Sequence, residues 1–468
     1  MLQADASVAG PDRLSPDAGI SWGGEIRATL ALAWPLVIAQ LATMAIHTTD
    51  VIMVGWLGPT QLAAGTLATA LIYPFLMFGT GVVTAVSPMI AQAIGARQYR
   101  SVRRTTRQGL WMALALAALL IPIVLQAEHI FLQVGQAPDT AALSQSYIDF
   151  AVWLFVPALL FMALRGLVAA HGLTSVVLWV TLIAIVLNAL GNYALMFGNF
   201  GLPRLELRGA GITTSLVHVA MFAMLLGYAV SHRRLKRYSI LARFWKPDSQ
   251  RFFAILRLGA PIGLMMAAEV GMFTAAAMLM GWLGTDQLAA HAVALQLAAL
   301  SFMVPLGISH AATIRVGIAH GAGHGPDIAK AGWTAIALAC GFMAFAALLF
   351  ISLPGPLIHL FFDARQPENA APIALAVGYL SIAALFQLVD GAQVSAAAAL
   401  RGISDTTMPM VMALVGYWVC GLPMAWLLGF PAGLEGIGIW LGLAFGLAVT
   451  AVTLTVRFMM RERFGLVG

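Results

Sequence analysis

The sequence predicts an all-α integral membrane protein whose twelve transmembrane helices form two six-helix lobes. Of the 468 residues, 61% are hydrophobic and only 9% are charged, whereas soluble domains carry about 25% charged residues. Apolar runs long enough to cross a hydrocarbon layer of roughly 30 Å recur along the whole chain. In addition, residues 53–64 (MVGWLGPTQLAA) reappear almost unchanged at 279–290 (LMGWLGTDQLAA). The protein is therefore polytopic and internally duplicated.

Charged residues, glycine and proline divide the apolar sequence into twelve candidate spans. In order, these are 28–56, 61–95, 108–133, 145–170, 174–199, 208–231, 258–283, 287–319, 330–361, 372–399, 408–430 and 435–460. The stretch before them contains three aspartates and no apolar core, so it is not a cleavable signal peptide. Cys340 and Cys420 both lie inside apolar runs, and a disulfide framework is not expected.

Most lysine and arginine residues are predicted to lie on one side of the membrane. All of the 25 basic residues except Arg204, Arg208 and Arg365 fall on the tails or on loops that follow even-numbered spans. Because basic loops stay in the cytoplasm, both termini are predicted to be cytoplasmic, in the cell inner membrane. We attribute the net charge of +6 to this topology and to lipid headgroup contact, not to nucleic-acid binding. The predicted domains are a leader at 1–26, an N-lobe at 27–232, a basic linker at 233–257 and a C-lobe at 258–468.

The repeat extends well beyond the twelve matching letters. At a constant offset of 226 residues, Pro35 matches Pro261 and Gly81 matches Gly307. Each half contributes an even number of helices, so the two copies insert in the same orientation, as parallel repeats about an axis along the membrane normal. Two such lobes facing each other would enclose a central cavity. We interpret the GWLG element as a site of helix packing, with glycines allowing close approach and tryptophans at the outer interface.

Three acidic residues lie well inside the predicted spans: Asp50, Glu269 and Asp390. An ionisable group inside a membrane costs several kcal/mol unless it faces a cavity or a partner, so each is a candidate functional residue. On the first span, polar residues spaced i, i+3, i+7 and i+10 form one stripe, namely Gln40, Thr43, His47 and Asp50. A second polar stripe on the fifth span consists of Thr181, Asn188, Asn192 and Asn199. Carboxylate and amide oxygens from these stripes would suit sodium or a relayed proton, although they could also simply join helices.

The acidic residues of the second half lie elsewhere in the repeat frame. Glu269 follows Pro261 on the seventh span, and Asp390 has Gln387 one turn before it and Phe386 on a neighbouring face. The helix that carries Glu269 is rich in methionine, with residues 265, 266, 272, 278 and 280. Met265 and Met266 could belong to an adaptable wall that binds varied ligands, or to ordinary core packing.

These motifs together resemble the multidrug and toxic compound extrusion (MATE) family, specifically its NorM-like branch. The resemblance is carried by TTDVIMVGWLG with QLAA, PMIAQAIGAR, LNALGNYALMFG and AAALRGISDTTMP, and it covers nearly the whole chain after residue 25. It implies a V-shaped transporter with a central cavity that exports cationic or amphipathic compounds in exchange for sodium ions or protons. By resemblance, Asp50, Asn188 and Asn192 form the N-lobe cation or proton site, and Glu269 and Asp390 the C-lobe carboxylates. Some relatives have a tyrosine where this chain has Phe386. The resemblance also suggests that the span containing Pro35 bends during transport.

Other classes of protein fit the sequence less well. No lysine lies in a GxxxxGK[ST] motif, so an ATP-driven pump is excluded, and no HExxH motif suggests a metalloprotease. We expect no enzymatic activity, no cofactor and a monomer. A passive channel would need a filter loop, which the sequence lacks. The main alternative is a lipid-linked oligosaccharide flippase, whose cavity would need arginines for pyrophosphate. Here Arg165, Arg315 and Arg401 lie near predicted cytoplasmic helix ends, and the charges at mid-membrane are acidic.

Overall fold

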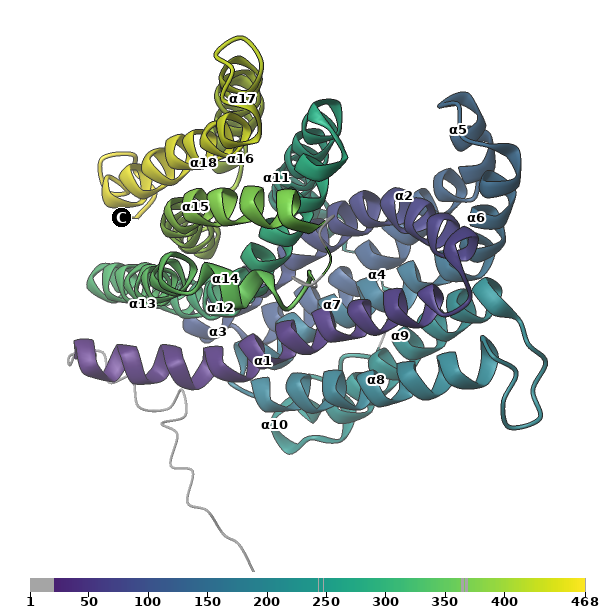
Figure 1. Ribbon diagram of the computed structural model, residues 1–468. Helices are drawn as coiled ribbons and strands as arrows, with labels where there is room; N and C mark the ends of the chain where they lie inside the picture. The colour runs from purple at the N-terminus through teal and green to yellow at the C-terminus, as the bar shows by residue number, and fades with distance from the viewer. Residues whose placement is uncertain (1–20, 243, 247, 363–365, 367–368, 468) are drawn as a thin grey trace, which may run out of the picture.

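The computed structural model describes residues 21–242, 244–246, 248–362, 366 and 369–467. Residues 1–20 of the predicted leader and Arg365 lie outside the described residues. Within these ranges the regular secondary structure is helical, and the helices form two groups (Figure 1).

The first half of the chain forms the N-lobe. Its helices are α1 (Trp22–Gly55), α2 (Pro59–Thr84), α3 (Val86–Gly95), α4 (Tyr99–Val124), α5 (Ala127–Gln133), α6 (Pro138–Ala151), α7 (Phe155–Ala170), α8 (Thr174–Leu195) and α9 (Glu206–Ser231). The short helix α10 (Arg233–Lys236) follows in the linker. The C-lobe consists of α11 (Ser249–Leu283), α12 (Thr285–Gly321), α13 (Gly325–Ser352), α14 (Pro354–Ile358), α15 (Ala370–Gly402), α16 (Thr407–Leu414), a π-helical segment (Val415–Gly421), α17 (Leu422–Gly429) and α18 (Glu435–Met459).

The described residues contain twelve helical segments long and apolar enough to cross a membrane, which confirms the predicted number. Several boundaries differ from the prediction: the fourth segment begins at Pro138 in place of 145, and the ninth is Gly325–Ser352 in place of 330–361. Three other spans differ at their starts. The first helix begins at Trp22, inside the predicted leader, the third covers Tyr99–Val124 in place of 108–133, and the seventh begins at Ser249 in place of 258. In each case the helix continues through polar or basic residues that the apolar pattern excludes, because backbone hydrogen bonding does not end where the apolar run ends. Side-chain caps mark two of these starts, Ser21 on α1 and Asp248 on α11.

The two halves contact each other reciprocally, as the parallel repeat predicts. Helix α1 packs on α12, and α2 packs on α11. A Cβ added to Gly81 would lie 2.4 Å from the Cα of Gly263, and one added to Gly307 would lie 2.4 Å from a Cγ of Val37. Under the offset of 226, Gly81 corresponds to Gly307 and Val37 to Gly263. The glycines therefore allow backbones to approach closely across a pseudo-twofold axis.

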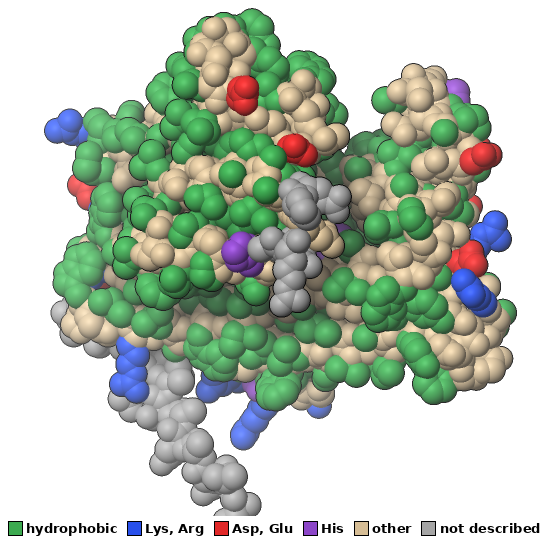
Figure 2. Space-filling view, in the orientation of Figure 1, with side chains coloured by type: hydrophobic (Ala, Val, Ile, Leu, Met, Phe, Trp, Pro, Cys, Tyr) green, Lys and Arg blue, Asp and Glu red, His purple; other side chains and the backbone are tan. Residues whose placement is uncertain are grey.

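These contacts lie at one end of the molecule. They involve the early part of α1 and α11, and the later part of α2 and α12, which is the end where the basic residues gather. The apolar core is continuous there, because one cluster joins N-lobe residues to Ile262, Ile308 and Ala398 of the C-lobe. At the other end, the surface is hollowed between a mass formed by α11 and α16–α18 and a mass formed by α5 and α6 (Figures 1 and 2). The lobes thus meet at the end predicted to be cytoplasmic.

The repeated GWLG element does not bring helices together as predicted. A Cβ added to Gly55 or Gly281 would meet nothing closer than 3.9 Å. The second glycine of each copy, Gly58 or Gly284, instead has a positive φ between two helices, of 122° and 138°, which side chains rarely tolerate. The tryptophans between them are about two-thirds exposed, as expected for an outer interface.

The glutamines that follow in the repeat make equivalent contacts in the two lobes. Gln61 Nε2 donates to Glu206 Oε2 at 3.0 Å, and Gln287 Nε2 donates to Glu435 Oε2 at 2.7 Å. Each glutamate is the first residue of the last helix of its lobe. The glutamine that both copies of the repeat contain thus links the second span to the sixth span of its own half.

Candidate functional site

Asp50 and the two asparagines of the fifth predicted span come together inside the N-lobe. Asp50 Oδ1 accepts hydrogen bonds from Asn188 Nδ2 at 2.9 Å and from Asn192 Nδ2 at 2.6 Å. Both asparagines are fully buried, and the Oδ1 atom of each has no hydrogen-bond partner. Thr181 lies two turns away and donates to the carbonyl of Val177 in its own helix. One carboxylate and two free amide oxygens are a ligand set suited to a hard cation.

Two further residues near Asp50 were missed in the sequence. His218 of α9 lies within electrostatic range of Asp50, as does His47, and the Nδ1 atom of His218 contacts the carbonyl of Thr214 at 2.8 Å. Tyr147 of α6 is buried and also within electrostatic range of Asp50. The only available signal was a pair of polar residues, 214 and 218, one turn apart in an apolar span.

The remaining members of the α1 stripe contact different partners. Gln40 Oε1 accepts from Arg165 of α7 at 3.4 Å, while Thr43 donates to a carbonyl of its own helix. The ring of His47 meets the ring of Tyr73 edge-on, with centroids 6.0 Å apart. Tyr73 is in turn within electrostatic range of Glu269. The stripe therefore includes His47, which contacts a tyrosine on which the charge of Glu269 in the C-lobe acts.

In the C-lobe, Asp390 and Gln387 are buried on α15. Asp390 is 4% exposed, and its Oδ1 atom has no hydrogen-bond partner. Gln387 donates through Nε2 to Ser301 Oγ, and its Oε1 atom is also without a partner. Glu269 is partly buried on α11, and its charge acts on Asp390. The two C-lobe acids therefore share one electrostatic environment.

Tyr417 adds a hydroxyl group to this environment. It is fully buried in the π-helical segment and lies within electrostatic range of both Glu269 and Asp390. Gln393 Nε2 donates to its hydroxyl oxygen at 2.6 Å. The wider turn of a π-helix changes the direction of side chains and often marks functional sites. No spacing in the sequence pointed to Tyr417. Its hydroxyl lies on a different helix from position 386, where this chain has phenylalanine and some relatives have tyrosine.

Two predicted C-lobe residues belong to the core. Phe386 is 2% exposed and packs between Phe273 and Trp440, with ring centroids 6.1 and 5.7 Å apart. Met265 is 7% exposed and joins the C-lobe apolar cluster, so ordinary packing explains it. Met266 is only partly buried and packs against the cluster that joins the lobes. Of the predicted methionine wall, only Met266 lies toward the other lobe.

Two arginines interact with residues of these sites or with their charges. Arg165 and Arg401 both occur in an ALRG sequence near the end of the fourth span of their half. Arg165 is 8% exposed and contacts Gln40, while the charge of Arg401 acts on Glu269 and on His310. The positive charge of Arg401 therefore acts on one of the C-lobe acids.

No group of three or more histidine, cysteine, aspartate or glutamate side chains that could hold a metal ion is found among the described residues. A cation at Asp50 would therefore depend on the amide oxygens of Asn188 and Asn192 as well as on the carboxylate. These amide oxygens have no hydrogen-bond partner, so they are available to such a cation.

The fold and these sites define a class of protein: a two-lobed helical membrane protein with a buried polar site in each lobe. Comparison with known sequences identifies the family. The family model MatE matches residues 35–194 and 261–427, and the chain belongs to this family, in its NorM-like branch. It is 44% identical to "Probable multidrug resistance protein NorM" of Mesorhizobium japonicum, over 99% of this chain and 98% of that protein. It is likewise 44% identical to the protein of the same name from Agrobacterium fabrum, over 95% and 96%.

Solved structures show the same fold. The outward-facing conformation of a multidrug resistance MATE family transporter of the MOP superfamily matches with a TM-score of 0.86 and 19% identity, over 94% of this chain and 96% of that one. The eukaryotic MATE transporter AtDTX14 matches with a TM-score of 0.84 and 19% identity, over 94% and 96%. The predicted two-lobed, twelve-helix architecture is confirmed.

Proposed function

We propose that this protein is a secondary active multidrug efflux transporter that exports cationic or amphipathic compounds by antiport with sodium ions or protons. The observation that carries this proposal is the Asp50 site, where a carboxylate inside a membrane span accepts hydrogen bonds from two buried asparagines whose amide oxygens have no partner. A buried ionisable group of this kind marks an ion or proton pathway. The names of the relatives, which are multidrug resistance proteins, supply the expected class of substrate.

The C-lobe acids supply a second pool of negative charge. Glu269 and Asp390 act on one another electrostatically, and a cation bound between them would relieve their repulsion. An ion and a cationic drug would therefore compete for this charge, as an exchanger requires. Tyr417, which lies within electrostatic range of both acids, is the candidate for a neutral oxygen ligand.

The alternative of a lipid-linked oligosaccharide flippase is not favoured. Its cavity would need several arginines to pair with pyrophosphate, whereas the charges at mid-membrane are acidic and the relatives are named multidrug resistance proteins.

Transport by the purified protein in proteoliposomes, with sodium and proton gradients imposed separately, tests the proposal. One gradient should drive uptake or release of a fluorescent organic cation, and Asp50→Asn should abolish the driven component. Asp139→Asn is the matched control, because it makes the same change at an exposed carboxylate in the first turn of α6. Export that is independent of both gradients would overturn the proposal.

The orientation with both termini inside the cell is part of the proposal. Trp245 in the linker is 78% exposed. A cysteine placed there should remain unlabelled by an impermeant maleimide added to intact cells and react once the membrane is opened. Labelling in intact cells would reverse the predicted topology.

A further inference from the structure

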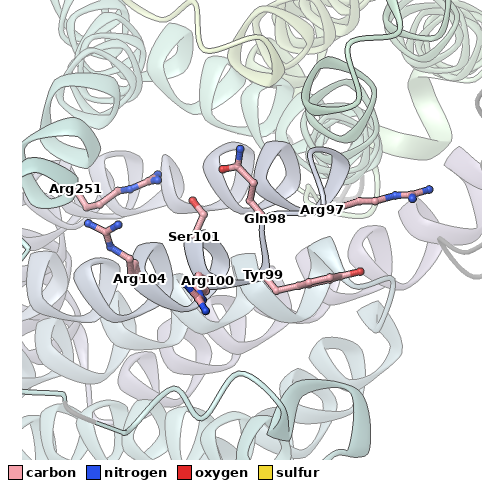
Figure 3. A pocket seen from close by; sticks show the side chains of 7 residues that line it. All are labelled: Arg97, Gln98, Tyr99, Arg100, Ser101, Arg104 and Arg251. Atoms are coloured by element: carbon pink, nitrogen blue, oxygen red, sulfur yellow. The ribbon is translucent and has the colours of Figure 1, made fainter.

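A basic pocket lies at the end of the molecule where the lobes meet. Its cavity has a volume of about 560 Å³. The lining residues are Arg97, Gln98, Tyr99, Arg100, Ser101, Arg104 and Arg251. Figure 3 shows Arg104 and Arg251 side by side at one end of the pocket, Ser101 between them and Gln98, and Arg97 at the other end. Four arginines therefore line the pocket, and the side chain of Arg97 extends away from the end where Arg104 and Arg251 lie.

The backbone at this pocket is also suited to an anion. Helix α4 begins here at Tyr99, and its N-cap residue Gln98 makes no side-chain capping hydrogen bond. The first turn of α4 carries no acidic residue. The free N–H groups at the start of a helix and the helix dipole place partial positive charge there. At the start of α4 this partial charge adds to the charge of the arginines that line the pocket.

The other lobe provides an internal comparison. In the repeat frame, the loop before α13 corresponds to the loop before α4, with Gly323 in the place of Arg97 and Asp327 in the place of Ser101. The loops have the same backbone form, since φ is 71° at Gly323 and 55° at Arg97. Helix α13 carries its own carboxylate, Asp327, in its first turn, whereas α4 does not. The N-lobe copy also keeps an arginine in a left-handed conformation that glycine adopts more easily.

The pocket connects the two lobes. Arg104 belongs to α4 of the N-lobe, and Arg251 belongs to α11, the first helix of the C-lobe. Asp248, the N-cap of α11, pairs with Arg104 at 2.6 Å and accepts from the backbone N–H of Arg251 at 3.2 Å. One carboxylate is thus set against four arginines, and an excess of positive charge remains at the junction.

We propose that this pocket binds a phosphate-bearing anion, held by Arg100, Arg104 and Arg251, the hydroxyl of Ser101 and the first N–H groups of α4. Arginine forks and a helix start are a recurrent combination for phosphate. The phosphate group of an anionic phospholipid and free inorganic phosphate share this chemistry. The lipid source fits the location, because the third membrane span begins at the pocket and Tyr99 is half exposed there, as aromatic residues at membrane interfaces are. The site is independent of which compound the protein exports.

Native mass spectrometry of the full-length protein tests the lipid source, by titration with phosphatidylglycerol against phosphatidylcholine. The pocket variant is Arg100→Gln with Arg251→Gln. The matched control is Arg103→Gln with Arg257→Gln, which removes two exposed arginines from the same helices outside the pocket and leaves the same net charge. We expect phosphatidylglycerol binding to weaken roughly tenfold in the pocket variant, from the loss of charge-assisted hydrogen bonds, and to change less than about twofold in the control.

A second arm measures thermal unfolding with and without millimolar inorganic phosphate in neutral detergent. If phosphate stabilises the wild-type protein and the control but not the pocket variant, the site is supported with soluble phosphate as its source. The single variant Arg100→Gln, at an exposed position, replaces the double variant should the latter unfold, and it should lose part of the same affinity. Equal effects of pocket and control variants in both arms would overturn the proposal, because binding would then follow net charge alone.

Discussion

The ion pair between Glu25 and Arg315 should hold the two lobes together at the end where they meet. Glu25 is in the first turn of α1, and Arg315 is on α12 of the other lobe. Arg315 Nε donates to Glu25 Oε1 at 2.9 Å, and its NH2 group donates to Oε2. The Glu25 side chain is 1% exposed and that of Arg315 is 19% exposed. Gln92 adds a second connection, donating to the carbonyl of Gly402 at 2.8 Å.

Glu25→Gln would leave the guanidinium group of Arg315 largely buried without its counterion. Removal of one partner of a buried pair costs about 3 to 5 kcal/mol, which we reduce to about 2 to 3 kcal/mol because Arg315 retains some contact with water. In a state where the lobes separate at this end, Arg315 would be hydrated and would not carry this penalty. The equilibrium should therefore shift toward the separated state by roughly 30- to 150-fold.

Cysteine labelling measures this shift. Val82 is fully buried between the lobes, where it faces Gly259 of α11. A cysteine at position 82, in a background without Cys340 and Cys420, should react with a maleimide roughly 30- to 150-fold faster when Glu25→Gln is present. Glu128→Gln, on an exposed residue of α5, is the control and should leave the rate unchanged. A rate for Glu25→Gln within about threefold of the parent would refute the role of the ion pair.

Three further outcomes are expected. Asp390→Asn should weaken export of organic cations about tenfold or more and make drug binding less sensitive to pH and sodium, because it removes one of two repelling carboxylates; unchanged pH and sodium dependence in binding assays would contradict a shared site. Pro35→Ala should leave folding intact and slow transport in proteoliposomes, because it restores a hydrogen bond inside α1 at the proposed bend; a wild-type rate would exclude the bend. Burial lowers the pKa of His171, between the fourth and fifth spans, to about 4, while an unfolded histidine titrates near 6.5. The stabilisation from neutral His171 is therefore complete above about pH 6.5 and is lost as the pH falls toward 4. Thermal unfolding of His171→Gln should depend less on pH in this window, and an identical dependence would show that another group is responsible.

The apolar pattern determined the number of spans and the duplication of the fold. A membrane requires about 20 apolar residues for each helical crossing, so spans can be counted without knowledge of their neighbours. A charged group inside a membrane is unfavourable, so few charged residues occur at such depth. This made Asp50, Glu269 and Asp390 identifiable as candidates. The helix ends were less predictable, as α4 shows, because its basic first turns are helical although they are not apolar.

Helical periodicity also placed Asp50 and the asparagine pair on single faces of their helices, but not against each other. The contact between Asp50 and Asn192 depends on how α1 and α8 are rotated and how they cross, which packing against other helices decides. For the same reason Phe386, which the sequence placed near Asp390, turns into the core, while Tyr417 from a distant span lies within electrostatic range of the acids.

The contact between the lobes was decided only in three dimensions. The repeat determined that Gly81 and Gly307 are equivalent, but their function as points of backbone approach depends on the residues opposite them, Gly263 and Val37. The basic pocket is a similar case. In the sequence, Arg97, Arg100 and Arg104 indicate only a cytoplasmic loop. In the structure they line a cavity, because α11, 150 residues later, places Arg251 beside Arg104. Sequence determines which residues a helix can present, and the packing of helices distant in the chain determines which of them meet.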